Sequence, residues 1–533
     1  MRVMSLGHAG LLIEAGGIRI ACDPWLSPRG AFLGGWFQLP QNHHLLARVL
    51  DPKIDVLYVS HGHLDHFDAD TLAELPRDIT MIAASFPSRP WVEQVRALGF
   101  EHVHFLDGEK TLEVAPGVTV QILTEDSAYF ADSALIVEAD GQVMVNLNDC
   151  HISEAQAKAI VARHPHIAAV FAQFSGANWY PFVYDFPEDV RVEAARHKVQ
   201  NSFLRWKGYM DALRPQWAIP FAGPPALLDP YTRRYMDAPD SIFPGPDVLQ
   251  SWLAANEPSL CDRTLPLLPG DWIELPEGRV ERDESMHSDF SWKKLGAYVD
   301  RYAERMADTV QAEVASFPWP TESLYPRFEA YFREMLAAGP RLATRVDARV
   351  LFDITGSGGG RWIVDFRALD VEDVTGDDRP YAALADYAFR LESRYLLPIL
   401  DGRYGWSDVY LSFRFHAWRP DVASYNEPLM TFLRFYKFED LRVREAMLAK
   451  LMSEKEQGSF TLETPEGTYE VQRFCPHTGE KLDANCYDPA LRAIVCPRHG
   501  WTFDVPGGAC RNGNATLRVV ERAPGLSEEG SRR

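Results

Sequence analysis

Several features are missing from this sequence, and each absence excludes a class of protein. No uninterrupted apolar run reaches the roughly 18 residues that cross a membrane as a helix, so we expect no membrane span. The N-terminal residues lack a charged region followed by an apolar run and a cleavage site, so we expect no secretory signal. An excess of basic charge is also missing. The formal net charge is −21, which argues against nucleic acid as a partner, because such proteins need a basic surface to displace counterions.

Cysteine is scarce, with 7 in 533 residues, an odd number without regular spacing. This predicts reduced thiols and metal ligands in a cytoplasmic protein rather than a disulfide framework. Apolar residues, by contrast, are plentiful: 46% of the chain is hydrophobic and 12% is aromatic. Because a chain of this length exceeds what one hydrophobic core normally holds, we expect two or three domains.

The order of apolar segments predicts three regions of different character. In the first, short apolar runs end in turn signals and helical runs lie between some of them, which is an α/β pattern. A longer helix is predicted from roughly Glu188 to Leu213, before a strand-like run at 217–223. Residues 350–366 predict a hairpin around a Gly-rich turn, and the chain is strand-rich from about Gly458. The predicted boundaries are 1–285, 286–455 and 456–533.

Two cysteine–histidine pairs lie near the C-terminus: Cys475 with His477, and Cys496 with His499. A Rieske [2Fe–2S] cluster needs this donor set, because two thiolates hold one iron and two imidazoles hold the other. Zinc is the alternative, since Cys and His at short spacing also suit a tetrahedral zinc site. Zinc fingers more often use CxxC and HxxxH pairs, so the pattern favours the Rieske cluster and a redox protein.

Residues 456–533, with the runs CPHTG and CPRHGWTFD, resemble Rieske ferredoxins and the Rieske domains of oxygenases. Rieske proteins of respiratory complexes carry an additional cysteine in each ligand loop, where this chain has Glu480 and Arg498. The resemblance therefore implies a small all-β domain of the low-potential, ferredoxin- or oxygenase-like kind. Cys486 and Cys510 lie outside the motif and are interpreted as ordinary thiols.

Three histidines and a carboxylate directly follow the apolar run DVLYVS in the pattern HxHxDH: His61, His63, Asp65 and His66. Such a cluster is unusual both in a core and on a plain surface, so it predicts a metal site. It resembles the signature of the metallo-β-lactamase fold, in which the first two His bind one metal and the Asp–His pair binds the second. That resemblance implies an αββα sandwich in which Asp149, from the run NLNDC, bridges two metals. We expect Asp65 and Asp149 to be catalytic as well as ligating.

Two histidines of the hydrolase pattern are missing. Where the third His is expected, before the bridging Asp, the chain offers Glu125, with Asp126 as the second choice. For the closing His it offers only Asp229, or His287 further along. Carboxylate in place of imidazole makes the donor set richer in oxygen, which suits iron better than zinc. Three further residues are interpreted as supporting rather than ligating: His8, Asp23 and His151.

The two sites together favour an oxygenase, because oxygen activation at iron uses electrons delivered singly and hydrolysis uses none. The runs DPW, SHGHLDHFD, DSALIVEADG, NLNDC and IPFAG resemble the CMP-N-acetylneuraminate hydroxylases, a family that joins a Rieske domain to a metallo-β-lactamase-like iron domain. That family places its Rieske domain first, whereas this chain places it last. The metallo-β-lactamase-fold diiron hydroxylases of antibiotic pathways are a second resemblance, through the carboxylate at the third position. Both imply one or two non-haem irons, with zinc as the alternative.

Three features bear on the substrate. The runs GGRWIVDF, LLPILDGRYGWSDVYLSFRF and YNEPLMTFLRF resemble sterol-carrier-type domains, which implies an apolar tunnel or a substrate-holding lobe; generic α+β packing is the alternative. Asn178, Trp179 and Tyr180 lie in a loop after an apolar strand, and such loops commonly line sites in α/β folds. Basic residues on the helix before WAIPFAG form either an anion-binding surface or a solvated face. They are Arg191, Arg196, Lys198, Arg205 and Lys207.

Three functions stay open at this point. The first is an iron monooxygenase with a small-molecule substrate, anionic or carrier-bound, and a ferredoxin or cytochrome with its reductase as electron donor. The second is a metal-dependent hydrolase of the lactonase or phosphodiesterase kind, in which the Rieske cluster is a redox sensor. The third is an electron-transfer module with a vestigial metal site. A homo-oligomer is compatible with all three.

Overall fold

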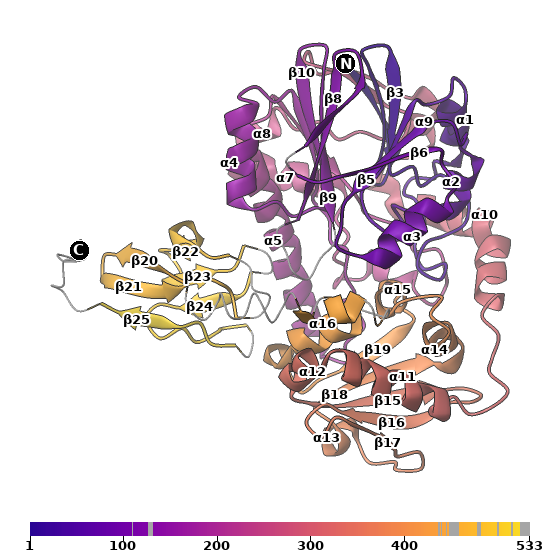
Figure 1. Cartoon of the computed structure of the whole chain (residues 1–533), viewed down its shortest axis with the longest axis vertical. Helices are drawn as coiled ribbons and strands as arrows, with labels where there is room; N and C mark the ends of the chain where they lie inside the picture. The colour runs from indigo at the N-terminus through magenta and orange to yellow at the C-terminus, as the bar shows by residue number, and fades with distance from the viewer. Residues whose placement is uncertain are drawn as a thin grey trace.

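Two β-sheets face each other in the N-terminal part of the chain, with helices on their outer faces (Figure 1). The computed structural model describes residues 1–108, 110–125, 132–434, 438, 440–443, 445–446, 458–476, 481–497, 500–512 and 515–522. In spatial order, the first sheet contains β14 Arg279–Glu281, β13 Trp272–Glu274, β1 Arg2–Gly7, β2 Gly10–Ala15, β3 Ile18–Cys22, β4 Val56–Val59, β5 Thr80–Ala84 and β6 His102–Leu106. The second contains β12 Trp217–Phe221, β11 Ala169–Gln173, β10 Gln142–Asn148, β9 Ser133–Ala139, β8 Val118–Thr124 and β7 Thr111–Ala115.

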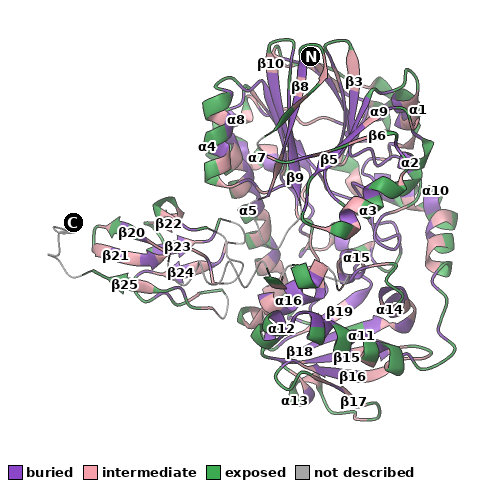
Figure 2. Ribbon diagram, in the orientation of Figure 1, coloured by how far each residue is buried: buried purple, intermediate pink, exposed green. Residues whose placement is uncertain are grey.

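One core fills the space between these sheets, and a second lies between the six-stranded sheet and its helices. Strands β3 to β6 pair in parallel, and β4 within this group is covered on both faces, which explains why it is apolar and buried at every position, whereas β6 is partly exposed. Figure 2 shows the strands of both sheets as largely buried. The predicted long helix is α5, with the expected bounds. The helices of this part are α1 Leu46–Leu50, α2 Ala69–Glu74, α3 Arg89–Ala97, α4 Glu154–Arg163, α5 Glu188–Leu213, α6 Arg234–Asp237, α7 Pro246–Asn256, α8 Pro258–Cys261 and α9 Glu284–Asp289.

The middle part is α+β, as predicted. Its sheet has the order β17 Asp370–Asp373, β16 Gly360–Asp365, β15 Arg349–Thr355, β18 Tyr387–Glu392 and β19 Phe415–Trp418. Strands β15 and β16 pair antiparallel from Arg349↔Asp365 to Ile354↔Gly360, which confirms the predicted hairpin. The helices are α10 Leu295–Ala315, α11 Tyr325–Ala338, α12 Pro340–Val346, α13 Tyr381–Leu384, α14 Ser393–Leu400, α15 Trp406–Leu411 and α16 Glu427–Arg434.

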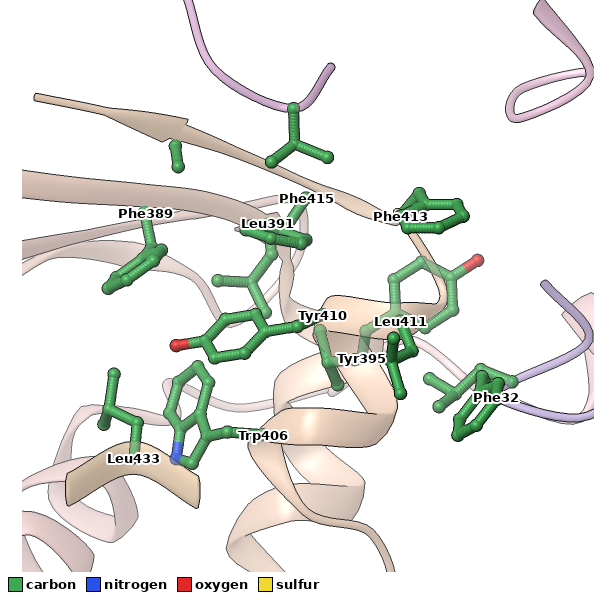
Figure 3. Packing of buried hydrophobic residues seen from close by; sticks show 14 of the residues in the cluster. Phe32, Phe389, Leu391, Tyr395, Trp406, Tyr410, Leu411, Phe413, Phe415 and Leu433 are labelled. Carbon is green, nitrogen blue, oxygen red and sulfur yellow. The ribbon is translucent and has the colours of Figure 1, made fainter. Parts of the chain in front are cut away.

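Aromatic rings fill the interior of this middle part (Figure 3). The centroid of the Tyr410 ring lies 5.5 Å from that of Phe389, 5.9 Å from that of Trp406 and 4.9 Å from that of Phe415. The core also continues into the N-terminal part, because Phe32 and neighbouring residues belong to the same buried cluster. These side chains fill the interior in which an apolar tunnel would have to lie. The residues that the middle part contributes to a site therefore lie at its edge.

The C-terminal part is a small lobe of two three-stranded sheets, which stands beside α5 in Figure 1. Its core contains both Cys475 and Cys496, together with Trp501 and Phe503. No helix of the described residues is long and apolar enough to cross a membrane. The strands are β20 Ser459–Thr464, β21 Gly467–Gln472 and β25 Val519–Glu521 in one sheet, and β22 Tyr487–Asp488, β23 Ala493–Val495 and β24 Thr502–Asp504 in the other.

Candidate functional site

The HxHxDH residues form a tight turn directly after β4. The N–H groups of His66 and Phe67 both donate to the carbonyl of His63, at 3.0 and 2.7 Å, and this turn gathers the three imidazoles. His61 Nε2 lies 2.8 Å from His63 Nδ1, and the ring centroids of His61 and His66 are 4.2 Å apart. His61, Asp65 and His66 are buried. Four potential ligands are thereby placed within one small, largely solvent-free space.

Asp149 joins this group from the end of β10. Its Oδ2 atom lies 3.5 Å from His66 Nε2, and Asp65 Oδ2 lies 3.8 Å from the same nitrogen. The ligand atoms of His61, His66 and Asp149 lie within 4.8 Å of one another, and so do those of His8, Asp65 and His66. The buried Oδ1 atoms of Asp65 and Asp149 accept no hydrogen bond from the described residues. Since burying an uncompensated carboxylate is costly, this donor set fits a bound cation.

Three buried residues hold the potential ligands in place. Asp132 Oδ1 lies 2.7 Å from His61 Nδ1, and Asp23 Oδ2 lies 2.8 Å from His66 Nδ1. Histidines that bind metal commonly donate their other ring N–H to a carboxylate, which fixes the tautomer and leaves Nε2 for the ion. His8 Nε2 lies 2.9 Å from Asp65 Oδ2 and orients that carboxylate in the same way.

The charges of the group are strongly coupled. Burial lowers the pKa of His66, but Asp65 and Asp149 beside it raise that pKa well above the usual value. Burial raises the pKa of Asp65, but His66 and His8 hold it well below the usual value. Burial and the neighbouring His61 lower the pKa of His63 to about 4, so His63 is neutral near pH 7, the form that a metal needs.

Glu125, the predicted replacement for the third histidine, lies at the end of β8. Its N–H donates to the carbonyl of Asp132 at 2.9 Å, so these two acidic residues face each other where β8 ends and β9 begins. Both line the cavity that contains the histidines. Asp126 lies outside the described residues. Asp132 was not predicted. The signal that could have found it is its place directly before β9, the strand that pairs with β8.

The candidates for the closing ligand are not brought to this group. Asp229 accepts from Arg414 Nη2 at 2.8 Å and from the Tyr231 N–H at 2.7 Å, and it does not line the cavity among the described residues. His287 Nε2 instead lies 2.9 Å from Asp271. A carboxylate from α15 lines the cavity instead.

That carboxylate belongs to Asp408, which lines the same cavity. Its Oδ2 atom accepts the Gly405 N–H at 2.7 Å. Burial, with a smaller contribution from the charge of Asp65, raises the pKa of Asp408 to about 6. A carboxyl group with this pKa exchanges its proton readily near neutral pH.

The two described Rieske cysteines, Cys475 and Cys496, are buried in the core of the C-terminal lobe. The Cys496 N–H donates to the carbonyl of Trp501 at 2.7 Å, and the Gly500 N–H donates to the carbonyl of Cys496 at 2.9 Å, which closes the second loop. None of the described cysteines forms a disulfide. Four residues discussed above lie outside the described residues: His477, Glu480, Arg498 and His499.

One cavity of about 1930 Å³ joins the two sites. Its wall contains the three predicted substrate-contact residues, and Leu411 and Asp408 cover it from the middle part. The Asn485 side-chain amide donates to both carboxylate oxygens of Glu154 in α4, at 3.0 and 3.1 Å, and ties the C-terminal lobe to this wall. The lining includes His61, His63, Asp65, Glu125, Asp132 and Asp149 on one side, Asn178, Trp179 and Tyr180 on the wall, and Cys496, Pro497, Gly500 and Trp501 on the other side.

Three family models match successive parts of the chain. Residues 2–168 match a beta-lactamase superfamily domain, residues 324–450 an SCP2-like domain, and residues 446–522 the Rieske [2Fe-2S] domain. The predicted metallo-β-lactamase fold, the sterol-carrier likeness and the Rieske domain are thereby confirmed. The domain boundaries at 285 and 455 remain predictions.

Relatives and solved structures share parts of this organisation. The chain is 28% identical over 532 residues to a Rieske 2Fe-2S iron–sulfur protein of Mycolicibacterium smegmatis, covering 96% of this chain and 98% of that one. It is 26% identical over 228 residues to cytidine monophosphate-N-acetylneuraminic acid hydroxylase of Danio rerio, covering 40% and 37%. The structure of CmlA, a diiron beta-hydroxylase from Streptomyces venezuelae, matches with a TM-score of 0.35 and 17% identity, covering 53% and 54%. The chain thus has homologues among both Rieske proteins and CMP-N-acetylneuraminate hydroxylases.

Proposed function

We propose that this chain is an iron-dependent monooxygenase that hydroxylates, or otherwise oxidises, a small organic substrate with dioxygen. The observation that supports this most directly is the single cavity lined by both His61 and Asp149 on one side and by Cys496 and its loop on the other. Hydrolysis at a metal needs no one-electron cluster in the same cavity, whereas oxygen chemistry at iron does. The sequence likeness to a hydroxylase over the N-terminal region agrees with this proposal.

The proposed ligand set combines imidazoles and carboxylates, which suits iron, with zinc as the alternative. The unpartnered Oδ1 atoms of Asp65 and Asp149 support a cation at this place. When bound, one or two irons would activate dioxygen with electrons supplied singly by the Rieske cluster. The proposed ligands are His61, His63, Asp65, His66, Glu125 and Asp149 at the iron site, and Cys475, His477, Cys496 and His499 at the cluster.

The chain's own side chains would perform three tasks around this centre. Asp132 and Asp23 fix the tautomers of His61 and His66, so that their Nε2 atoms face inward. Trp179 and Tyr180 would hold the substrate against the cavity wall. Asp408, whose pKa is about 6, would hold a proton on the Oδ1 atom, because Oδ2 already accepts the Gly405 N–H.

The proposed partners follow from the redox chemistry. An external one-electron donor, a ferredoxin or a cytochrome with its reductase, would reduce the Rieske lobe, and His499 would be the exit for electrons toward the iron site. We place the protein in the cytoplasm, and homo-oligomerisation stays open. Electron transfer within one chain is favoured because Cys496 and the HxHxDH residues share one cavity.

The test compares aerobic and anaerobic turnover of the purified chain with an electron donor. The proposal expects product only with dioxygen and donor present, loss of turnover in His499→Ala with the N-terminal metal retained, and loss in Asp149→Ala with a cluster that still reduces normally. A hydrolase would turn over substrate without air or donor, and His499→Ala would then matter little. That outcome would replace the oxygenase with the hydrolase.

A further inference from the structure

The cavity wall contains a buried guanidinium that forms no close ion pair with a described residue. Arg419 directly follows β19, is 3% exposed, and lines the cavity. Its Nε and Nη1 atoms make no hydrogen bond to the described residues. The closest acids in sequence have other hydrogen-bond partners: Asp421 accepts from the Ser424 N–H and hydroxyl, and Glu427 accepts from the Thr431 hydroxyl at 3.2 Å. The Ser424 hydrogen bonds lower the pKa of Asp421, and the charge of Arg419 still acts on Asp421 and contributes to that lowering. No described carboxylate lies within ion-pair distance of Arg419.

Aromatic rings surround this guanidinium. Its central carbon lies 4.8 to 5.4 Å from the ring centroids of Tyr180, Tyr184, Phe186 and Tyr425. Such contacts stabilise the positive charge, but the ring faces provide no acceptor in line with the N–H groups. A guanidinium held rigidly among rings, with donors unused, is prepared for a planar anion.

A second cation contacts one of these rings. The Lys198 ammonium, from α5, is 5.7 Å from the centroid of the Tyr180 ring that also contacts Arg419. Lys198 lines the cavity and forms no ion pair with a described residue. Burial, with a contribution from Arg205, lowers the pKa of Lys198 to about 7. Arg419 and Lys198 thus add positive charge to the cavity wall of a chain whose net charge of −21 otherwise repels anions.

Arg205 also lines the cavity, whereas two other basic residues of α5 do not line it and are paired with carboxylates. Arg191 pairs with Asp240 at 2.6 Å, and Arg196 pairs with Glu193 on the surface. Tyr425, by contrast, connects the site to the cluster loop: its ring centroid lies 6.3 Å from that of Trp501. The site therefore lies in the wall of the cavity that the iron ligands and the cluster loop share.

We propose that Arg419 is an anion-binding subsite for a carboxylate or a phosphate of the substrate, with Tyr180 and Tyr425 as its aromatic walls and Lys198 as a separate positive charge on the same cavity wall. As a statement about substrate, this rests on the monooxygenase proposed above. The substrate class is an organic anion whose charged group is held at Arg419 while the remainder extends toward the HxHxDH residues.

The test measures binding rather than turnover, with the full chain kept anaerobic and without donor. Phenyl phosphate and phenylacetate are the probes, benzyl alcohol is the uncharged control, and calorimetry gives the affinity. The anions should bind more tightly than the alcohol, and the tighter of the two identifies phosphate or carboxylate. Arg419→Gln should weaken anion binding by about tenfold or more, because it removes charge-assisted hydrogen bonds, whereas Lys198→Gln should weaken it less.

Arg196→Gln is the matched control, a basic residue two positions from Lys198 that already has an exposed partner. It should bind both anions like the unaltered chain. If Arg419→Gln does not fold, as judged by circular dichroism and the cluster's spectrum, Arg419→Lys decides, since it keeps the charge but removes the planar pair of donors and should also weaken anion binding. Equal affinity for anions and alcohol, or full affinity in a folded Arg419 variant, overturns the subsite. If turnover proves to be hydrolytic but the anions still bind at Arg419, the monooxygenase is wrong and the subsite is retained.

Discussion

Asp132 is a buried carboxylate that supports a proposed iron ligand without being a ligand itself. It holds His61 through a 2.7 Å contact to Nδ1. Asp132→Ala should therefore weaken iron binding at the N-terminal site by about 10–100-fold, the range for loss of such supporting groups, and should leave the Rieske spectrum unchanged. Iron titration of the chelator-treated protein measures the affinity. Asp107→Ala, an exposed carboxylate paired with Lys110, is the control that should bind iron normally. Unchanged affinity in Asp132→Ala would remove its supporting role.

Glu125 remains the predicted replacement for the third histidine. Glu125→Ala should lose iron from the N-terminal site while the reduced Rieske signal stays intact. Asp126→Ala, at the second-choice position, should keep its site iron. Metal analysis together with electron paramagnetic resonance separates the two variants. Loss of site iron in Asp126→Ala, with full iron in Glu125→Ala, would move the ligand by one residue.

At the level of elements, α15 brings an acid from the middle part to the cavity that contains the proposed metal ligands. The pKa of Asp408 is raised from 3.8 to about 6 mainly by burial, so its ionised form is disfavoured in the folded state. The folded chain should therefore lose stability as the pH rises from 3.8 through 6. Asp408→Asn should remove that loss and gain about 1–2 kcal/mol above pH 6, but nothing below pH 3.8. Urea unfolding of iron-free protein at both ends of this range measures the difference.

Asp421→Asn is the control for that pH dependence. Hydrogen bonds from Ser424 keep the pKa of Asp421 below its usual value, so its ionised form is favoured in the folded state. This variant should show no gain in stability as the pH rises. The difference in unfolding free energy between Asp408→Asn and the unaltered chain should depend on pH. A difference that is the same at every pH would contradict the buried position of that carboxyl group.

The N-terminus of α4 holds the C-terminal lobe through Glu154, which accepts both hydrogen bonds from Asn485. Glu154→Ala should loosen the lobe and increase the radius of gyration in small-angle scattering. It should also slow reoxidation of the cluster, if the docked position is the one that transfers electrons. Glu188→Ala, an acidic residue in the first turn of α5, is the control. Identical scattering from both variants would show that the Glu154 contact does not hold the lobe.

Local patterns in the sequence were sufficient to predict several helices and strands and to identify the HxHxDH motif. Helix α5 has the predicted bounds because its length and turn signals are local properties, and the hairpin of β15 and β16 is determined by its own Gly-rich turn. Asp408 and Arg419 could not be found in this way. They reach the cavity from the middle part, and no periodicity links them to His61, which lies more than three hundred residues earlier.

At the scale of the whole molecule, the C-terminal position of the Rieske lobe does not separate it from the N-terminal metal site. The middle part shares a continuous core with the N-terminal part, and α4 and α5 present the wall on which the lobe rests. Gly500 in the cluster loop lies so close to α5 that an added Cβ atom would be 2.7 Å from Asn201 Nδ2. Folding therefore brings together two sites that the sequence places at opposite ends.

Metal content distinguishes the two whole-molecule functions at low cost. The monooxygenase predicts iron in excess of the two atoms of the cluster, with little zinc, because its donor set is rich in carboxylate. Mass spectrometry of protein purified from cells supplied with both metals measures the ratio. Iron for the cluster alone, with zinc filling the N-terminal site, would favour the hydrolase instead.

The most direct measurement of the central claim, that the cluster supplies electrons to the HxHxDH site, is the rate at which dioxygen reoxidises the reduced cluster. The protein is reduced anaerobically and mixed with dioxygen in a stopped-flow instrument, and the absorbance of the cluster is followed. The account predicts fast reoxidation in the unaltered chain and slow reoxidation in Asp149→Ala, whose cluster is intact but whose electrons have no acceptor. Equal rates in the two proteins, with the N-terminal site of the unaltered chain fully loaded with iron, would contradict it.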